Sequence, residues 1–157
     1  MSGETTTTTV KVSGEAAEVA RAEALAVLAL VSDENRRSRL ADLVAAVDDG
    51  VLDSEQAEGL GELLELGLAT GRIRSTYGPG GEQASLALFR RLPQGRDLSE
   101  STRELTEALS GLEGRTLEKV SVTSVGPGEY GISISTDGYE IVLRLGRAGA
   151  RVSSIGT

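Results

Sequence analysis

The stretch EYGISISTDGYEIVLRL, residues 129–145, consists of two alternating segments joined by the turn sequence TDG. In each segment an apolar side chain occupies every second position, which is the pattern of a β-strand with one buried face. The apolar positions are Tyr130, Ile132 and Ile134 in the first segment and Tyr139, Ile141, Leu143 and Leu145 in the second. The positions between them are mostly polar or small, so the stretch predicts an antiparallel hairpin with one apolar and one polar face.

Similar segments lie on both sides of this hairpin. TLEKVSVTSV precedes it and ends at the turn GPG, and ARVSSI follows it after the turn GRAG. Short alternating segments separated by glycine-containing turns are typical of an antiparallel meander. The apolar face of such a sheet needs a cover. We expect the preceding helix to supply it, through an apolar stripe made of Leu98, Leu105, Leu109 and Leu112.

The first half of the chain has helical periodicity instead. Residues 15–31 are rich in Ala and contain neither Pro nor Gly, which favours a first helix. Ser32 or Asp33 is a suitable cap for a second helix, which ends at the sequence DDG, residues 48–50. Asp53 and Gln56 have the spacing of a capping box and predict the start of a third helix.

Three glycines lie within or at the end of this third helical segment. Gly59 and Gly61 weaken a helix intrinsically, so we expect them where another backbone approaches closely. Gly67 is the expected C-cap of the helix.

The next segment, RIRSTYGPGGEQASLALFRRL at residues 72–92, is compatible with two structures. In the first, residues 72–77 and 84–90 pair as a β-hairpin across GPGG. In the second, which we favour, a helix begins near Glu82 and carries its apolar residues on one side.

Three helices followed by a hairpin resemble the winged-helix arrangement in order and spacing, and this resemblance covers residues 33–92. It implies that the third helix is the recognition helix that reads DNA. The exposed positions of that helix carry four carboxylates, Glu55, Glu58, Glu62 and Glu65. Contacts to bases and phosphates need Arg, Lys, Asn or Gln instead, so we favour protein binding over DNA binding for this module.

These patterns together predict an α+β protein. Residues 1–14 form a flexible tail or an edge strand, and residues 15–92 form a helical, winged-helix-like module. Residues 93–97 form a linker. Residues 98–157 form a C-terminal helix packed on an antiparallel β-meander.

The composition removes most of the familiar catalytic and metal-binding chemistry. The chain has no His and no Cys, so it lacks the commonest general base, the thiolate nucleophile and the preferred zinc ligands. The GPGG turn lacks the Lys-Ser/Thr of a P-loop, and no Ser lies in a G-x-S-x-G elbow. We therefore expect no enzymatic activity, no cofactor and no bound metal.

The net charge of -8 opposes binding to phosphate backbones and anionic lipids, so a nucleic-acid partner is not expected. The chain begins without the basic and apolar regions of a signal peptide, and its longest apolar run, ALAVLALV, is too short to span a membrane. We expect a cytoplasmic protein. The abundance of Ala, Gly and Arg suits a GC-rich bacterial genome.

Candidate interaction residues fall into two groups. The second half of the first helix is apolar on nearly all sides, so it belongs either in a core or in an oligomer contact, with Ala24, Val27, Leu28 and Val31 as the contact residues. Basic side chains near GPGG either stay solvated or bind an anion or an acidic partner surface, and they are Arg72, Arg74, Arg90 and Arg91.

The sequence thus predicts a non-catalytic interaction, scaffold or assembly subunit that forms homo-oligomers, binds a partner protein, or does both. The alternative is a winged-helix transcription regulator whose C-terminal unit serves for dimerisation or sensing.

Overall fold

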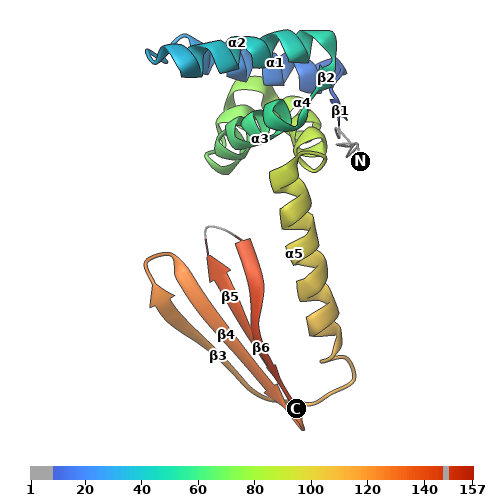
Figure 1. Cartoon of the computed structure of the whole chain (residues 1–157). Coiled ribbons are helices and arrows are strands. Elements are labelled where there is room, and N and C mark those ends of the chain that lie inside the picture. The colour runs from blue at the N-terminus through green and yellow to red at the C-terminus, as the bar shows by residue number, and fades with distance from the viewer. Residues whose placement is uncertain (1–8, 147–148) are drawn as a thin grey trace, which may run out of the picture. The chain divides into compact units, whose positions relative to one another are not determined.

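The computed structural model describes residues 9–146 and 149–157 of the chain. Within these ranges, five helices and a two-stranded sheet precede a four-stranded antiparallel sheet (Figure 1), which confirms the α+β class. The chain divides into two compact units with the boundary between Arg96 and Asp97. We refer to them as the N-terminal unit and the C-terminal unit.

Four helices and two short strands build most of the N-terminal unit. In chain order they are β1 (Val10–Lys11), α1 (Gly14–Leu28), α2 (Glu34–Asp49), β2 (Val51–Leu52), α3 (Ser54–Ala69) and α4 (Arg72–Phe89). Strand β1 pairs antiparallel with β2, so the described part of the N-terminal segment contains an edge strand. Helix α1 contacts α2, α3 and α4, and the side chains between these helices form an aliphatic core.

Local capping explains where α2 and α3 begin. The Asp33 carboxylate accepts a hydrogen bond from the Arg36 backbone N–H at 2.8 Å. At the start of α3, Asp53 accepts from the Gln56 backbone N–H and the Gln56 side chain accepts from the Asp53 backbone N–H, at 2.8 and 2.9 Å. This is the predicted capping box, and it satisfies two backbone donors that have no partner inside the helix.

Residues 72–89 form helix α4, so the hairpin alternative is wrong and the helix alternative is confirmed, with an earlier start than Glu82. Gly71 has a φ of 72°, which ends α3 and allows the chain to re-enter a helix at once. A second break occurs at Gly78, with a φ of 73°, and Pro79 follows it at the kind of position that Pro favours at a helix start. No wing therefore follows α3 in the described part of the chain.

Two other glycine assignments also need correction. Gly67 is not a C-cap, because α3 continues to Ala69 and Gly67 lies buried inside the helix. Gly61 does permit a close approach, but its neighbour is the Gln94 side chain and not a backbone. Gly59 has no neighbour within 4 Å of the position that a Cβ would occupy.

The predicted linker at residues 93–97 is helical. It forms the first turn of α5 (Pro93–Ser110), because Pro93 lies at the first helical position, where its missing N–H costs nothing. Asp97 and Glu100 have the spacing of a capping box, which would start a helix after the linker, but Asp97 lies inside α5. Gly95 is buried next to the end of α4, where a Cβ would overlap the Phe89 carbonyl group.

The C-terminal unit contains the predicted meander. Its strands are β3 (Leu117–Gly126), β4 (Glu129–Thr136), β5 (Tyr139–Gly146) and β6 (Gly149–Gly156), and they lie in that order in the sheet. The register aligns the apolar positions across the sheet: Ile134 lies opposite Val120 on one side and Ile141 on the other. Helix α5 packs against this sheet, and the Tyr139 hydroxyl donates to the Ala108 carbonyl at 3.0 Å. The predicted leucine stripe covers the sheet less fully than expected, because Leu98 and Leu109 remain exposed.

Replacing Gly95 with Ala should destabilise the N-terminal unit by about 2 kcal/mol, because the added methyl group overlaps a backbone carbonyl that cannot move aside easily. Gly59→Ala is the matched control: its methyl group meets open space, and it should stabilise the helix by about 0.5–1 kcal/mol. Urea unfolding of both variants measures the difference. Equal effects would contradict the described packing at Gly95.

Candidate functional site

The candidate contact residues of α1 lie in or against the N-terminal core. Ala24 is fully buried, and Val27, Leu28 and Val31 are partly buried against the same core. Helix α1 ends at Leu28, so Val31 lies beyond its end. Most of the apolar surface predicted for this helix is therefore used within the chain.

The four candidate arginines do not share one partner. Arg72 pairs with Glu23, and Arg74 pairs with Glu82 at 3.1 Å. Arg90 and Arg91 follow α4, are exposed, and form no ion pair with any residue that the structure describes. These arginines thus do not form a common anion site in the described structure.

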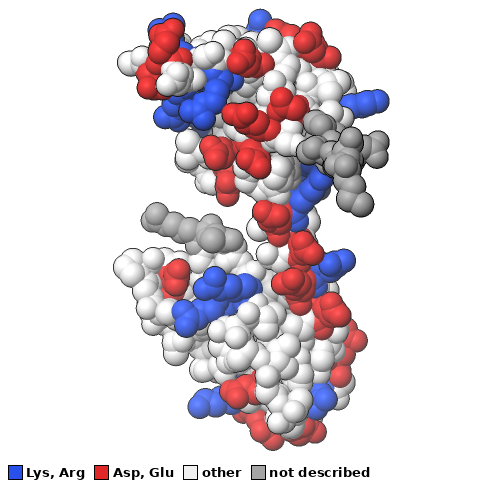
Figure 2. All heavy atoms as spheres, viewed as in Figure 1, with Lys and Arg blue, Asp and Glu red and all other residues white. Residues whose placement is uncertain are grey.

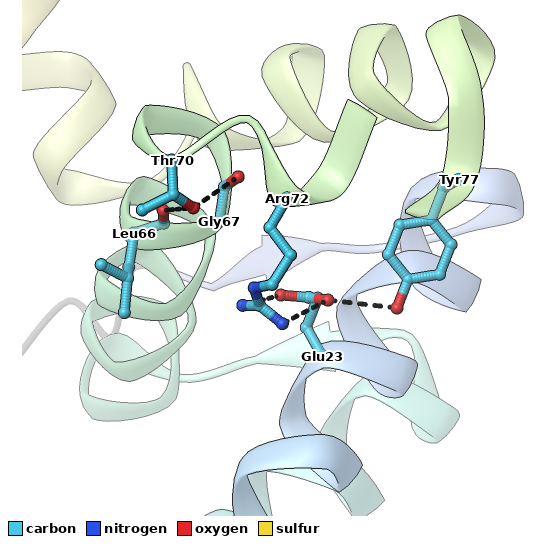
Figure 3. Close-up of polar contacts among 6 residues, drawn as sticks. All are labelled: Glu23, Leu66, Gly67, Thr70, Arg72 and Tyr77. Carbon is cyan, nitrogen blue, oxygen red and sulfur yellow. Dashed lines mark hydrogen bonds and ion pairs between the residues drawn. The ribbon is translucent and has the colours of Figure 1, made fainter. Parts of the chain in front are cut away.

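The pairing of Arg72 reveals a buried carboxylate that the sequence patterns did not single out. The Glu23 side chain is almost completely buried, and its carboxylate forms an ion pair with the Arg72 guanidinium, with Nη1 at 3.1 Å from Oε1. The Tyr77 hydroxyl donates a hydrogen bond to the same Oε1, also at 3.1 Å (Figure 3). The cluster joins α1 to the first half of α4.

Burial within this cluster affects the phenol of Tyr77. Its pKa is raised from the usual value of 10.0, first because burial disfavours the phenolate, and then because the hydrogen bond to Glu23 and the charge of that carboxylate oppose ionisation. The Arg72 charge acts in the opposite direction. Since Glu23 is occupied by Arg72 and Tyr77 and shielded from solvent, we assign the cluster a structural role.

Helices α2 and α3 enclose a groove of about 880 Å³ in the N-terminal unit. Apolar side chains contribute to its floor and sides, including Val27, Leu40, Leu43 and Leu63. Charged side chains surround them, and they are Arg36, Arg39, Asp42, Asp49, Asp53, Glu55, Glu58 and Glu62. Figure 2 shows acidic side chains distributed over the visible face of this unit around a basic patch. We call the groove between α2 and α3 the acidic groove.

On the apolar face of the C-terminal sheet, burial differs strongly between the strands. Ile141 and Leu143 of β5 are 0% and 7% exposed, whereas Val120 and Val122 of β3 are 55% and 63% exposed. Tyr130 of β4 is 50% exposed. We call Val120, Val122 and Tyr130 the open sheet face.

The contacts of α5 explain this difference. The helix meets the beginning of β5 through Tyr139, which lies against both Ala108 and Gly111. Leu98 lies near Gly149 at the beginning of β6. These contacts of the helix are thus with the beginnings of β5 and β6. The apolar side chains of β3 keep their exposure to water, and so does Ile155 near the end of β6.

Comparison with known proteins gives no match: no family model, curated protein or solved structure is significantly similar to this chain. Among the described helices, none combines the length and the apolar character that a membrane crossing requires.

Arg72→Ala should destabilise the protein by about 1–3 kcal/mol, because it leaves the buried Glu23 carboxylate without its counter-ion. Arg74→Ala is the matched control: the Arg74 side chain is largely exposed and its partner Glu82 is partly exposed, so losing this pair should cost less than about 1 kcal/mol. Chemical denaturation measures both losses. A loss at Arg72 no larger than that at Arg74 would show that Glu23 does not depend on this ion pair.

Proposed function

We propose that this protein is a non-catalytic assembly subunit, and that its partner at the open sheet face is a second copy of the same chain. The observation that carries this proposal is the incomplete cover of the C-terminal sheet. Val120, Val122 and Tyr130 remain at least half exposed, as does Ile155 on the other edge strand, whereas Ile141 and Leu143 between them are buried. A contiguous exposed apolar surface is a common mark of a protein-binding site.

The dimensions of a helix and a sheet account for the incomplete cover. Neighbouring strands lie about 4.8 Å apart, and a helix with its side chains is about 10 Å wide. One helix therefore covers about two strands, and this sheet has four. In the described part of the C-terminal unit, only Ile141 and Leu143 among the apolar side chains are buried, which is a small core for a unit of this length.

Apolar burial on the open sheet face is not sufficient for a stable dimer. Burying one half-exposed Val or Tyr contributes on the order of 1 kcal/mol, whereas a micromolar complex needs about 8 kcal/mol. A second contribution is required. Strand β3 supplies one, because it is an edge strand whose outer backbone groups have no neighbouring strand among the described residues.

The sequence of β3 suits antiparallel pairing with itself. A two-fold axis at Ser121 places Val120 opposite the partner subunit's Val122, so that the apolar faces of two sheets become continuous. The same register places Lys119 opposite Thr123 of the partner subunit. No like charges are then opposed along the shared edge, and the backbone groups of both strands gain partners.

A DNA-binding regulator remains the second candidate, but no specific observation favours it. Helix α3 carries exposed carboxylates at Glu55, Glu58, Glu62 and Glu65, and helix α4 occupies the place of the wing. The net charge of -8 also opposes approach to a phosphate backbone. These features support a protein partner instead.

We expect light scattering of the wild-type protein to give twice the 16.3 kDa mass of one chain. Val122→Lys should give a particle of one-chain mass with an unchanged circular dichroism spectrum, because the ammonium group cannot be buried at the shared face. Thr123→Glu is the control for adding a charge to this strand: Thr123 lies on the opposite face, where a carboxylate would face Lys119 of the partner subunit, so this variant should remain dimeric. A wild-type protein that stays monomeric at high concentration would contradict self-association.

A further inference from the structure

The acidic groove between α2 and α3 is a second candidate surface, and it lies in the N-terminal unit, separate from the open sheet face. We infer that this groove binds a cationic amphipathic helix of a partner protein. This inference concerns a different unit from the self-association proposed above, and the two are tested by different variants.

The first argument is the shape of the groove. Its lining residues on α2 run from Arg36 to Asp49, which is roughly 20 Å of helix at 1.5 Å per residue. A docked helix of about four turns matches this length. With a volume of about 880 Å³, the groove is large enough to take a row of side chains from such a helix.

The second argument is the apolar strip along the groove. Leu40 and Leu43 are buried in the wall of α2, while Val27 and Leu63 are partly exposed and Val51 is exposed. These side chains offer contacts to the apolar positions of an amphipathic helix, which recur at i, i+3, i+4 and i+7.

The third argument is the charge around that strip. Six carboxylates and two guanidinium groups line the groove. Within the described ranges, none of these carboxylates forms an ion pair. A ligand with Lys or Arg beside its apolar stripe supplies the missing counter-ions, whereas an acidic helix or a nucleic acid is repelled.

Gly59 provides the means for a close approach on the α3 side. It lines the groove, and a Cβ at this position would have open space around it. The missing side chain lowers the α3 wall between Glu55 and Glu62, so the backbone of a docked helix can come nearer to α3. This is the role that the sequence suggested for the glycine, with the partner coming from outside the chain.

The charged side chains also give the groove a direction. Arg36 and Arg39 lie in the first part of α2, whereas Asp49 lies at its end. A carboxylate near one end of the ligand helix pairs with the arginines, and its cations pair with Glu58 and Glu62 on α3. The preferred ligand is therefore cationic along most of its length, with an acidic residue at one end.

The test uses a fluorescent helical peptide with Leu at i, i+3, i+4 and i+7 and Lys at the other positions. Fluorescence anisotropy at moderate salt should show binding to the wild-type protein. A peptide with Glu in place of Lys, and a scrambled Lys/Leu peptide of the same composition, should each bind about tenfold or more weakly. Equal binding of the scrambled peptide would overturn the inference, because it would show a charge attraction without a groove.

Variants of the protein locate the site. Glu58→Lys combined with Glu62→Lys should weaken peptide binding about tenfold, and so should Gly59→Leu, which fills the α3 side without changing the charge. Glu100→Lys combined with Glu104→Lys makes the same charge change on α5, outside the groove, and should leave the affinity within about twofold.

Circular dichroism verifies that each variant is folded before its affinity is compared. Equal losses in the α3 and α5 charge variants, or full affinity in Gly59→Leu, would place the binding outside the groove and overturn the inference. Val122→Lys should bind the peptide with wild-type affinity, so failure of the groove and failure of self-association are distinguishable.

Discussion

The main constraint on the C-terminal unit is one of width: its sheet has four strands, and one helix covers about two of them. Helix α5 contacts β5 and β6, and it leaves the apolar side chains of β3 in water. The N-terminal unit has a larger core, which contains seventeen buried apolar residues among those that the structure describes. This contrast is the reason why we propose that a second copy covers the C-terminal unit and not the N-terminal one.

The two units are thus suited to different kinds of contact. The C-terminal sheet offers an apolar face beside a free strand edge, a combination that suits pairing with an identical sheet. The N-terminal unit is complete in itself and offers a charged groove with an apolar strip, which suits a helix of opposite charge. In both cases we propose that the chain binds a protein surface. The Glu23 cluster joins α1 to α4 within the N-terminal unit.

Much of the fold was predictable from the sequence where the signal is local. Alternation in residues 129–145 predicted the meander, and the pair Asp53 and Gln56 predicted the start of α3. The start of α4 at Arg72 was missed because Gly78 and Pro79 normally end a helix. They do interrupt this one, but helical turns lie on both sides of the break. The prediction of a linker at 93–97 was wrong for a related reason. Pro interrupts the interior of a helix but is favoured at its first position, which is where Pro93 lies.

The candidate sites were harder to predict, because they depend on contacts between distant residues. Nothing local marks Glu23 as the partner of Arg72, although its position four residues after Val19, on the buried side of α1, is a signal that could have been used. The acidic positions of α3 were recognised, but the groove beside them requires the packing of α2. The exposure of the apolar β3 side chains depends on where α5 lies on the sheet, which local sequence patterns do not specify.

The most direct test of this account is hydrogen–deuterium exchange of the wild-type protein at low and at high concentration. If two copies pair through β3, amides in residues 117–126 should exchange more slowly at high concentration, while amides of the interior strand β4 change little. Exchange in β3 that does not depend on concentration, up to the solubility limit, would contradict the claim that a second copy covers the open sheet face.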